Sequence, residues 1–203
     1  GDVAGVRLRI VQPNIAQAAK WQPEQRAAIF HTLIDLSATP SNRPPTHVIW
    51  PEAATPFFLL QSEAALAQIS RLVPATGAVI TGAPRMGAAT STDANPIYNS
   101  VVAVDGDGGV PALYDKAHLV PFGDFVPPGF AWFLAMANIP MSDSKPGASG
   151  QAPMRIAGQK VAVNICYEDA FGEEIIRALP EATLLVNLSN VAWFGDSLAP
   201  AQH

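Results

Sequence analysis

Three ionisable side chains stand just beyond predicted strands, where they could act together in a reaction. Glu52 follows the apolar run 47–50, and Lys116 follows the second strand of a predicted hairpin. Cys166 ends the alternating run 161–165. Ligand sites of layered α/β proteins form at strand ends, so a cysteine there can face a cleft while its strand stays rigid. The placement makes these three residues candidates for one site.

Together the three residue types supply what thiol chemistry requires. A free thiol has a pKa of about 8.5, so a nucleophilic cysteine needs a neighbouring base. The Glu52 carboxylate could accept the thiol proton of Cys166, and the Lys116 ammonium could stabilise an oxyanion. Each residue also has an ordinary alternative: Glu52 a solvated carboxylate, Lys116 a surface charge, Cys166 a buried core residue. Spacing alone does not prove that they meet.

Composition narrows the classes of function. The chain has 203 residues, 49% hydrophobic and 14% charged, with a net charge of −5, which favours one globular domain. Its four lysines are scattered, so nothing suggests a nucleic-acid binder. The single cysteine excludes an intrachain disulfide, and no apolar run is long enough to span a bilayer. The four histidines show no metal-ligand spacing, so we expect neither a metal nor another cofactor.

Predicted strands and helices alternate along the chain. Period-two patterns and turn residues predict strands over 6–11, 47–50, 78–81, 97–104, 110–114, 160–166 and 183–188. Helices are expected from Pro23, over 62–73 with Ser62 as N-cap, and over 171–179. The first of these helices has an apolar face that includes Leu36. This order predicts an α/β layered domain with helices covering a mixed sheet.

Three ordered segments resemble the signatures of the nitrilase superfamily. They are Trp50-Pro51-Glu52, the run 115–123 that begins Asp-Lys-Ala-His, and Asn164-Ile165-Cys166-Tyr167-Glu168. Shorter likenesses at 12–14 and 189–190 extend the resemblance over nearly the whole chain. The resemblance implies a four-layer α-β-β-α sandwich with a Glu-Lys-Cys triad. By position, Glu52 would be the general base, Lys116 the oxyanion-stabilising lysine and Cys166 the nucleophile.

Further segments resemble one branch, the apolipoprotein N-acyltransferase family. They comprise 21–23, 98–100, 118–127, 166–168 and 192–195. This likeness implies a set of supporting residues: Asp124, Glu168, Tyr167, Asn99 and Trp21. The family has Glu where Asp124 stands, and Asp is one methylene shorter. Its common Asn-Asp pair before Ala-Trp-Phe is Asn-Val here.

The branch also implies an activity and partners. Its members move a fatty acyl chain from a membrane phospholipid to the amino group of a diacylglyceryl-cysteine in apolipoproteins. Phe57, Phe58, Trp132 and Phe133 are then candidates for a lipid-facing loop. The implied location is the bacterial inner membrane, with the catalytic domain facing the periplasm. Residues 1–203 are expected to form a single catalytic domain, with a transmembrane domain and a C-terminal part outside the chain.

Two other functions stay open. A soluble nitrilase-type amidase would hydrolyse a small amide or carbamoyl compound with the same three residues. Relatives of that kind often carry Arg-Phe-Pro-Glu soon after the cysteine, where this chain has Asp169-Ala170-Phe171-Gly172. A non-catalytic binding module would instead keep Cys166 buried and unreactive.

Overall fold

The computed structural model describes residues 2–73, 76–91, 93–120, 124, 144–173, 181–194 and 198. The strands of this part of the chain form two sheets. The five-stranded sheet has the order β1 (Leu8–Ile10), β2 (His47–Ile49), β3 (Ala78–Met86), β4 (Ile97–Asp105) and β5 (Ala112–Asp115). The three-stranded sheet has the order β6 (Met154–Ile156), β7 (Gln159–Ile165) and β8 (Leu184–Leu188).

Both sheets are mixed, as the alternating elements predict. In the larger sheet β1, β2 and β3 run parallel, whereas β3, β4 and β5 are antiparallel neighbours. The predicted hairpin joins β4 to β5, and Asp105 Oδ1 closes its turn by accepting the N–H groups of Asp107 and Gly109. In the smaller sheet β6 is antiparallel and β8 parallel to β7. The sequence analysis missed β6.

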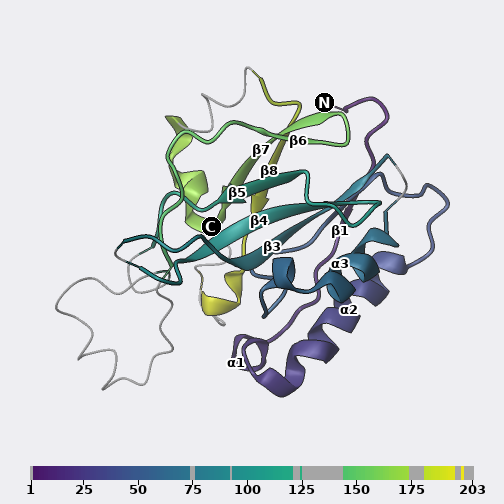
Figure 1. Cartoon of the computed structure of the whole chain (residues 1–203). Helices are drawn as coiled ribbons and strands as arrows, with labels where there is room; N and C mark the ends of the chain where they lie inside the picture. The colour runs from purple at the N-terminus through teal and green to yellow at the C-terminus, as the bar shows by residue number, and fades with distance from the viewer. Residues whose placement is uncertain are drawn as a thin grey trace.

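The helices pack on one side of the larger sheet (Figure 1). The main ones are α2 (Arg26–Ala38) and α3 (Glu63–Ser70), preceded by the single turn α1 (Gln17–Lys20). Ser62 caps α3 as predicted, because its Oγ accepts the N–H of Ala65 at 3.3 Å. Pro23 begins a 3-10 turn, Pro23–Gln25, that leads into α2. Leu36 is 41% exposed, so the apolar face of α2 is narrower than predicted. Further 3-10 turns are Leu59–Gln61, Cys166–Ala170 and Val191–Phe194.

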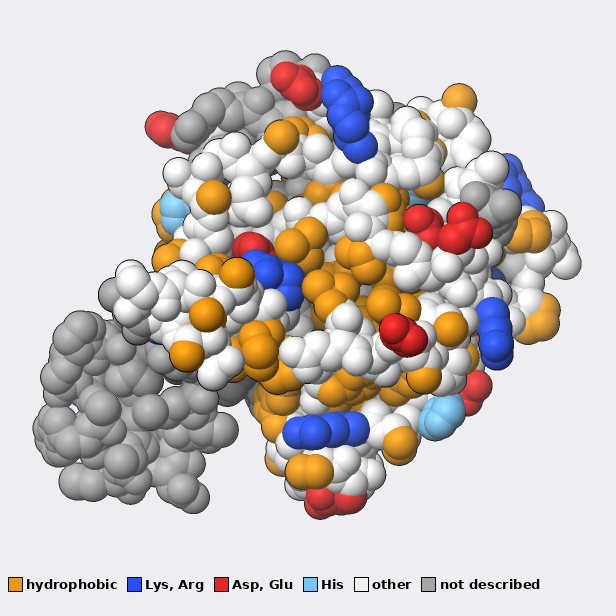
Figure 2. Space-filling model, in the orientation of Figure 1, with side chains coloured by type: hydrophobic (Ala, Val, Ile, Leu, Met, Phe, Trp, Pro, Cys, Tyr) orange, Lys and Arg blue, Asp and Glu red, His pale blue; other side chains and the backbone are white. Residues whose placement is uncertain are grey.

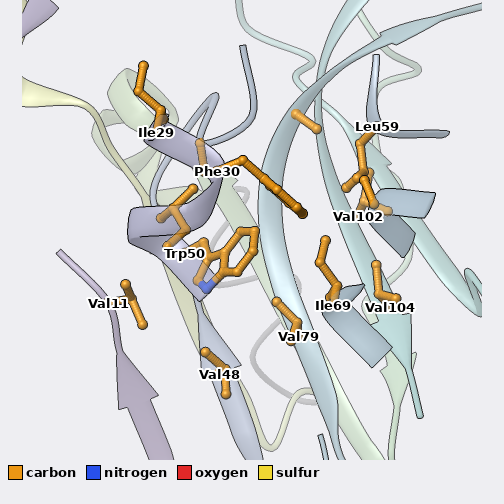
Figure 3. Packing of buried hydrophobic residues seen from close by; sticks show 14 residues of the cluster. Val11, Ile29, Phe30, Val48, Trp50, Leu59, Ile69, Val79, Val102 and Val104 are labelled. Atoms are coloured by element: carbon orange, nitrogen blue, oxygen red, sulfur yellow. The ribbon is translucent and has the colours of Figure 1, made fainter. Parts of the chain in front are cut away.

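A first core fills the space between these helices and the five-stranded sheet. Trp50 is fully buried there, with Phe30 of α2 edge-on to it at a centroid distance of 6.2 Å (Figure 3). The indole Nε1 of Trp50 donates to Ser37 Oγ at 2.8 Å, so its polar atom is satisfied inside the core. This packing fixes Trp50, which directly follows β2 and stands two residues before Glu52.

A second core lies between the two sheets. Ile49 and Ile80 of the larger sheet share it with Ile156, Val163 and other residues of the smaller one. The described part of the chain therefore has three layers, α2 and α3, the five-stranded sheet and the three-stranded sheet, which confirms the predicted α/β sandwich. The predicted helix over 171–179 lies outside the described residues beyond position 173.

The surface carries few charges. On the face drawn in Figure 2, hydrophobic side chains gather near the middle and Lys and Arg side chains are dispersed. Among the described residues, no helix has the length and hydropathy to cross a membrane.

The buried imidazole of His47 should make the fold sensitive to acid. His47 is 2% exposed, and burial lowers its pKa although a hydrogen bond with the Ile156 backbone opposes this. Unfolded His47 takes up a proton below about pH 6.5, whereas the folded side chain resists it until a lower pH. The stabilising contribution is therefore complete above about pH 6.5 and is lost as pH falls through the folded pKa.

Urea unfolding at about pH 5 and about pH 7.5 tests this expectation. His47→Gln should reduce the difference in unfolding free energy between the two pH values. His31→Gln, at an exposed position of α2, is the matched control. An unchanged pH difference in His47→Gln would contradict the assignment.

Candidate active site

Glu52 is held in place through both oxygens of its carboxylate. Its side chain is 9% exposed, just past β2. Oε1 accepts the side-chain amide of Asn99 at 2.8 Å, and Oε2 accepts the N–H of Asn190 at 2.9 Å. The two donors come from β4 and from the segment after β8, so Glu52 lies where the two sheets meet. A carboxylate fixed in this way is an oriented hydrogen-bond and proton acceptor.

Lys116 points at the same place from the end of β5. Its Nζ lies 2.7 Å from Asp124 Oδ2 and 3.7 Å from Glu52 Oε1, and its side chain is 2% exposed. The Lys116 N–H donates to the carbonyl of Asn99, so Asn99 orients both Glu52 and Lys116. The shorter side chain of Asp124 therefore does reach Lys116. Burial acts to lower the pKa of Lys116, but Glu52 and Asp124 offset this, and the pKa is raised. Lys116 is an ammonium at neutral pH.

Cys166 occupies a strained turn at the end of β7. Its φ of 51° lies in the left-handed region, which non-glycine residues seldom adopt outside constrained sites. Its carbonyl accepts the side-chain amide of Asn187 at 3.1 Å. Burial first, and then Glu52, raise the pKa of the thiol to about 11, although Lys116 and the N–H of Tyr167 oppose them. The resting group is therefore a neutral thiol, and it would need a base to act as a nucleophile.

Glu168 ties the Lys116 segment to the Cys166 turn. It is 1% exposed, and Oε1 accepts the N–H groups of Ala117 and His118 at 2.7 and 3.0 Å. Oε2 accepts the N–H of Ile165 at 2.8 Å, and the Tyr114 hydroxyl donates to the same carboxylate. Glu168 therefore supports the site by fixing main-chain segments on either side of it.

The remaining predicted residues lie further out. Tyr167 is 50% exposed, and Trp21 is 44% exposed with its ring centroid 5.9 Å from Lys20 Nζ. Phe57 is partly buried against the helix-side core, edge-on to Phe30 at 5.6 Å, and its lipid-facing role stays a prediction. Phe58 is half-buried, and its lipid-facing role stays a prediction. Trp132 and Phe133 lie outside the described residues.

Four contributors to the site were missed by the sequence analysis. Glu52 is bound by Lys20 and Asn190, and Cys166 is bound by Asn187. The fourth residue, Gly82, lies against the main chain of residues 51–53. Most of these contacts are made to or by main-chain atoms, so side-chain type gives little signal for them. Within the described ranges, no group of three His, Cys, Asp or Glu side chains could hold a metal ion.

The carbon-nitrogen hydrolase family model matches residues 7–203. The chain belongs to the carbon-nitrogen hydrolase family. Among curated members, the apolipoprotein N-acyltransferase of Nitrosomonas europaea is 42% identical over 205 residues, covering 98% of this chain and 39% of that protein. The apolipoprotein N-acyltransferase of Ralstonia nicotianae is 41% identical, covering 98% of this chain and 38% of its own length. The chain therefore spans about two fifths of the length of these relatives.

Solved structures of carbon-nitrogen hydrolases share the fold. A carbon-nitrogen hydrolase from Helicobacter pylori G27 superimposes with a TM-score of 0.62 at 17% identity, covering 91% of this chain and 59% of that one. An amidase from Nesterenkonia sp. AN1 gives 0.61 at 19% identity, covering 97% and 68%. The latter structure carries the acetamide moiety of fluoroacetamide covalently added at its active-site cysteine. At these identities the likeness establishes the sandwich architecture alone.

Glu168→Gln should destabilise the protein, because it removes the buried carboxylate that accepts main-chain N–H groups from two segments. A glutamine turns an amide N–H₂ toward at least one of the main-chain N–H groups that the carboxylate now accepts. Each buried donor left unsatisfied costs about 1–3 kcal/mol. Urea unfolding should record a loss of that size, while Glu24→Gln at an exposed position should change little. Equal unfolding free energies of the two variants would show that the Glu168 carboxylate does not stabilise the fold.

Gly82→Ala should displace the Glu52 loop. A Cβ at this position would lie 2.5 Å from Ala53 N, 2.6 Å from Glu52 Cα and 2.7 Å from Pro51 O, all main-chain atoms. Overpacking costs about 1–3 kcal/mol, and a shift of the carboxylate by about 1 Å can cost about 100-fold in rate. Acylation of Cys166 by a p-nitrophenyl ester and thermal unfolding measure the two effects. Gly172→Ala, where a Cβ meets nothing within 4 Å, is the control. Identical acylation rates would contradict the expected displacement.

Proposed function

We propose that the chain is the catalytic domain of an apolipoprotein N-acyltransferase, with Cys166 as nucleophile, Glu52 as base and Lys116 as oxyanion donor. The observation that carries the proposal is that the three side chains come together. The charges of Glu52 and Lys116 both shift the pKa of the Cys166 thiol, and Lys116 Nζ lies 3.7 Å from Glu52 Oε1. Family membership and the curated relatives at about two fifths identity support the acyl-transfer chemistry.

The first half-reaction acylates the cysteine. Glu52 takes the thiol proton as the Cys166 sulfur attacks the ester carbonyl of a phospholipid, and the oxyanion that forms is stabilised by Lys116. The tetrahedral intermediate collapses with cleavage of the C–O bond. The leaving lysophospholipid oxygen takes the proton from Glu52. A thioester on Cys166 remains.

The second half-reaction transfers the acyl chain. The neutral α-amino group of a diacylglyceryl-cysteine attacks the thioester carbonyl, and Lys116 again faces the oxyanion. Glu52 accepts a proton from the amine nitrogen. Collapse then breaks the C–S bond, and the departing Cys166 sulfur recovers that proton. The products are an amide and the free thiol, as expected of a ping-pong enzyme.

The substrates define where the domain works. A phospholipid donor and a lipid-modified acceptor both belong to a membrane surface, so we place the protein at the bacterial inner membrane with this domain facing the periplasm. Residues 1–203 act as one catalytic domain, and a transmembrane domain outside this chain would supply the attachment. The length of the curated relatives leaves room for it. The candidates for lipid contact are Phe57, Phe58, Trp132 and Phe133.

A small-amide hydrolase is the second candidate. The Nesterenkonia amidase shares the fold and carries an acetamide-derived adduct at its cysteine, which supports amide chemistry at a site of this kind. The first half-reaction would then release ammonia from an amide, and water would replace the amine in the second. The two candidates differ in donor and acceptor.

Incubation of the full-length protein with phospholipid distinguishes them. Intact-mass spectrometry should record a fatty-acyl increase on the wild type and none on Cys166→Ala, because only the thiol can form the thioester. Neutral hydroxylamine should remove the adduct. Cys166→Ala should lower transfer to a diacylglyceryl-peptide by at least about 1,000-fold, as expected for a lost nucleophile.

Two outcomes would contradict the acyltransferase proposal. Retained transfer in folded Cys166→Ala would exclude the cysteine as nucleophile. Absence of the acyl adduct in folded wild type, together with ammonia release from small amides, would favour the hydrolase.

A further inference from the structure

Lys20 binds the main chain of the proposed base, Glu52, whereas Lys116 lies near its carboxylate. Lys20 ends α1, and it is only 7% exposed despite its charge. Its Nζ donates to the main-chain carbonyl of Glu52 at 3.1 Å. Ammonium groups are seldom buried unless a specific partner compensates for the loss of water. Neither half of the proposed mechanism uses Lys20, so its burial calls for a separate explanation.

The carbonyl that Lys20 binds belongs to a constrained turn. Ala53, the next residue, has a φ of 45°, in the left-handed region that non-glycine residues seldom occupy. Gly82 fixes the turn from below, since its N–H donates to Pro51 O and its carbonyl accepts the N–H of Ala54. The Glu52 carbonyl in this turn needs a hydrogen-bond donor, and Lys20 supplies it.

Charge balance gives a second reason for the position of Lys20. Glu52 and Asp124 bring two carboxylates into the buried cluster, and Lys116 brings one ammonium. Lys116 lies nearer Asp124, at 2.7 Å, than Glu52, at 3.7 Å. With Lys20 the formal charges of these four groups sum to zero. Burial lowers the pKa of Lys20 to about 8 against the opposing effect of Glu52, so it is mainly an ammonium at pH 7.

We propose that Lys20 is a positioning residue for Glu52: it fixes the main chain at the base and balances the charge of the buried cluster. The proposal rests on the role of Glu52 proposed above. Removal of the ammonium leaves the cluster with a net negative charge, which disfavours the negative charge that appears on the sulfur and then on the oxyanion as Glu52 takes the thiol proton. It also releases the carbonyl and lets the carboxylate shift.

Single-turnover acylation tests Lys20 without any assumption about the natural donor. The probe is p-nitrophenyl butyrate, and the readout is the burst of p-nitrophenolate from the full-length protein, corrected with Cys166→Ala. Lys20→Met should slow the burst by about 10- to 100-fold, the range expected for a displaced catalytic group. Lys160→Met is the matched control, because Lys160 is a half-exposed lysine whose partner Glu181 lies 3.8 Å away at the surface. A burst in Lys20→Met as fast as in wild type would overturn the proposal.

A double-mutant cycle separates positioning from general destabilisation. If Lys20 acts through Glu52, Lys20→Met should add little to the loss already caused by Glu52→Gln. Fully additive losses would overturn the proposal. Where Lys20→Met does not fold, Lys20→Gln takes its place in the cycle, since it keeps an N–H donor without the charge. Wild-type burst rates in Lys20→Gln would overturn the charge-balancing part.

Chemical rescue tests whether the ammonium charge of Lys20 matters, apart from the space that its side chain fills. Lys20→Ala removes the atoms of a propylammonium ion, so added n-propylammonium should restore the burst, whereas n-propanol should not. Equal rescue by both would show that the side chain only fills space.

Failure of the acyltransferase proposal can be distinguished from failure of the Lys20 proposal. A wild-type burst without acylation by phospholipid would overturn the lipid donor and leave the Lys20 result standing. If folded wild-type protein gives no burst of p-nitrophenolate, both proposals are overturned.

Discussion

The Glu168 carboxylate is the contact on which the geometry of the site depends. It accepts N–H groups from the loop after β5 and from the end of β7, which belong to different sheets. Apolar packing between sheets is non-directional and permits small sliding movements, whereas hydrogen bonds to a buried carboxylate permit very little. Lys116 and Cys166 follow these two strands directly. One carboxylate, bound to the residues next to Lys116 and Cys166, therefore fixes the separation of these two side chains.

The backbone is strained in two turns of the site, at Cys166 and next to Glu52. Cys166 and the residue after Glu52 both have left-handed backbone conformations, and donors from other elements hold the carbonyls of Cys166 and Glu52. Such conformations persist only where the surroundings over-determine them. The two cores on either face of the five-stranded sheet provide that rigidity, since Trp50 and Ile49 immediately before the Glu52 turn are packed on opposite sides. Glu52 and Cys166 can therefore lie in turns while the strands before them stay fixed.

The sequence predicted the parts of this arrangement that side-chain types reveal. Alternating apolar residues located β4, β7 and β8, Ser62 marked the start of α3, and the strand ends located Glu52, Lys116 and Cys166. It missed β6, whose three residues are too few to show a period. Lys20 and Gly82 could not be found, because they act on main-chain atoms brought near only by the fold.

The protonation states explain why these charges are buried together. Burial keeps Cys166 as a neutral thiol in the resting site, so the negative charge next to Lys116 belongs to Glu52 and Asp124. In the proposed mechanism the thiol proton moves to Glu52 during attack, so this carboxylate becomes neutral as the oxyanion appears. One negative charge is thus exchanged for another beside the same ammonium, and the net charge of the cluster does not change. A preorganised site of constant charge needs little reorganisation as the reaction proceeds, which is the condition under which fixed dipoles and charges accelerate acyl transfer most. Any substitution that alters the net charge of the cluster should therefore affect the barrier even where it leaves Cys166 and Lys116 in place.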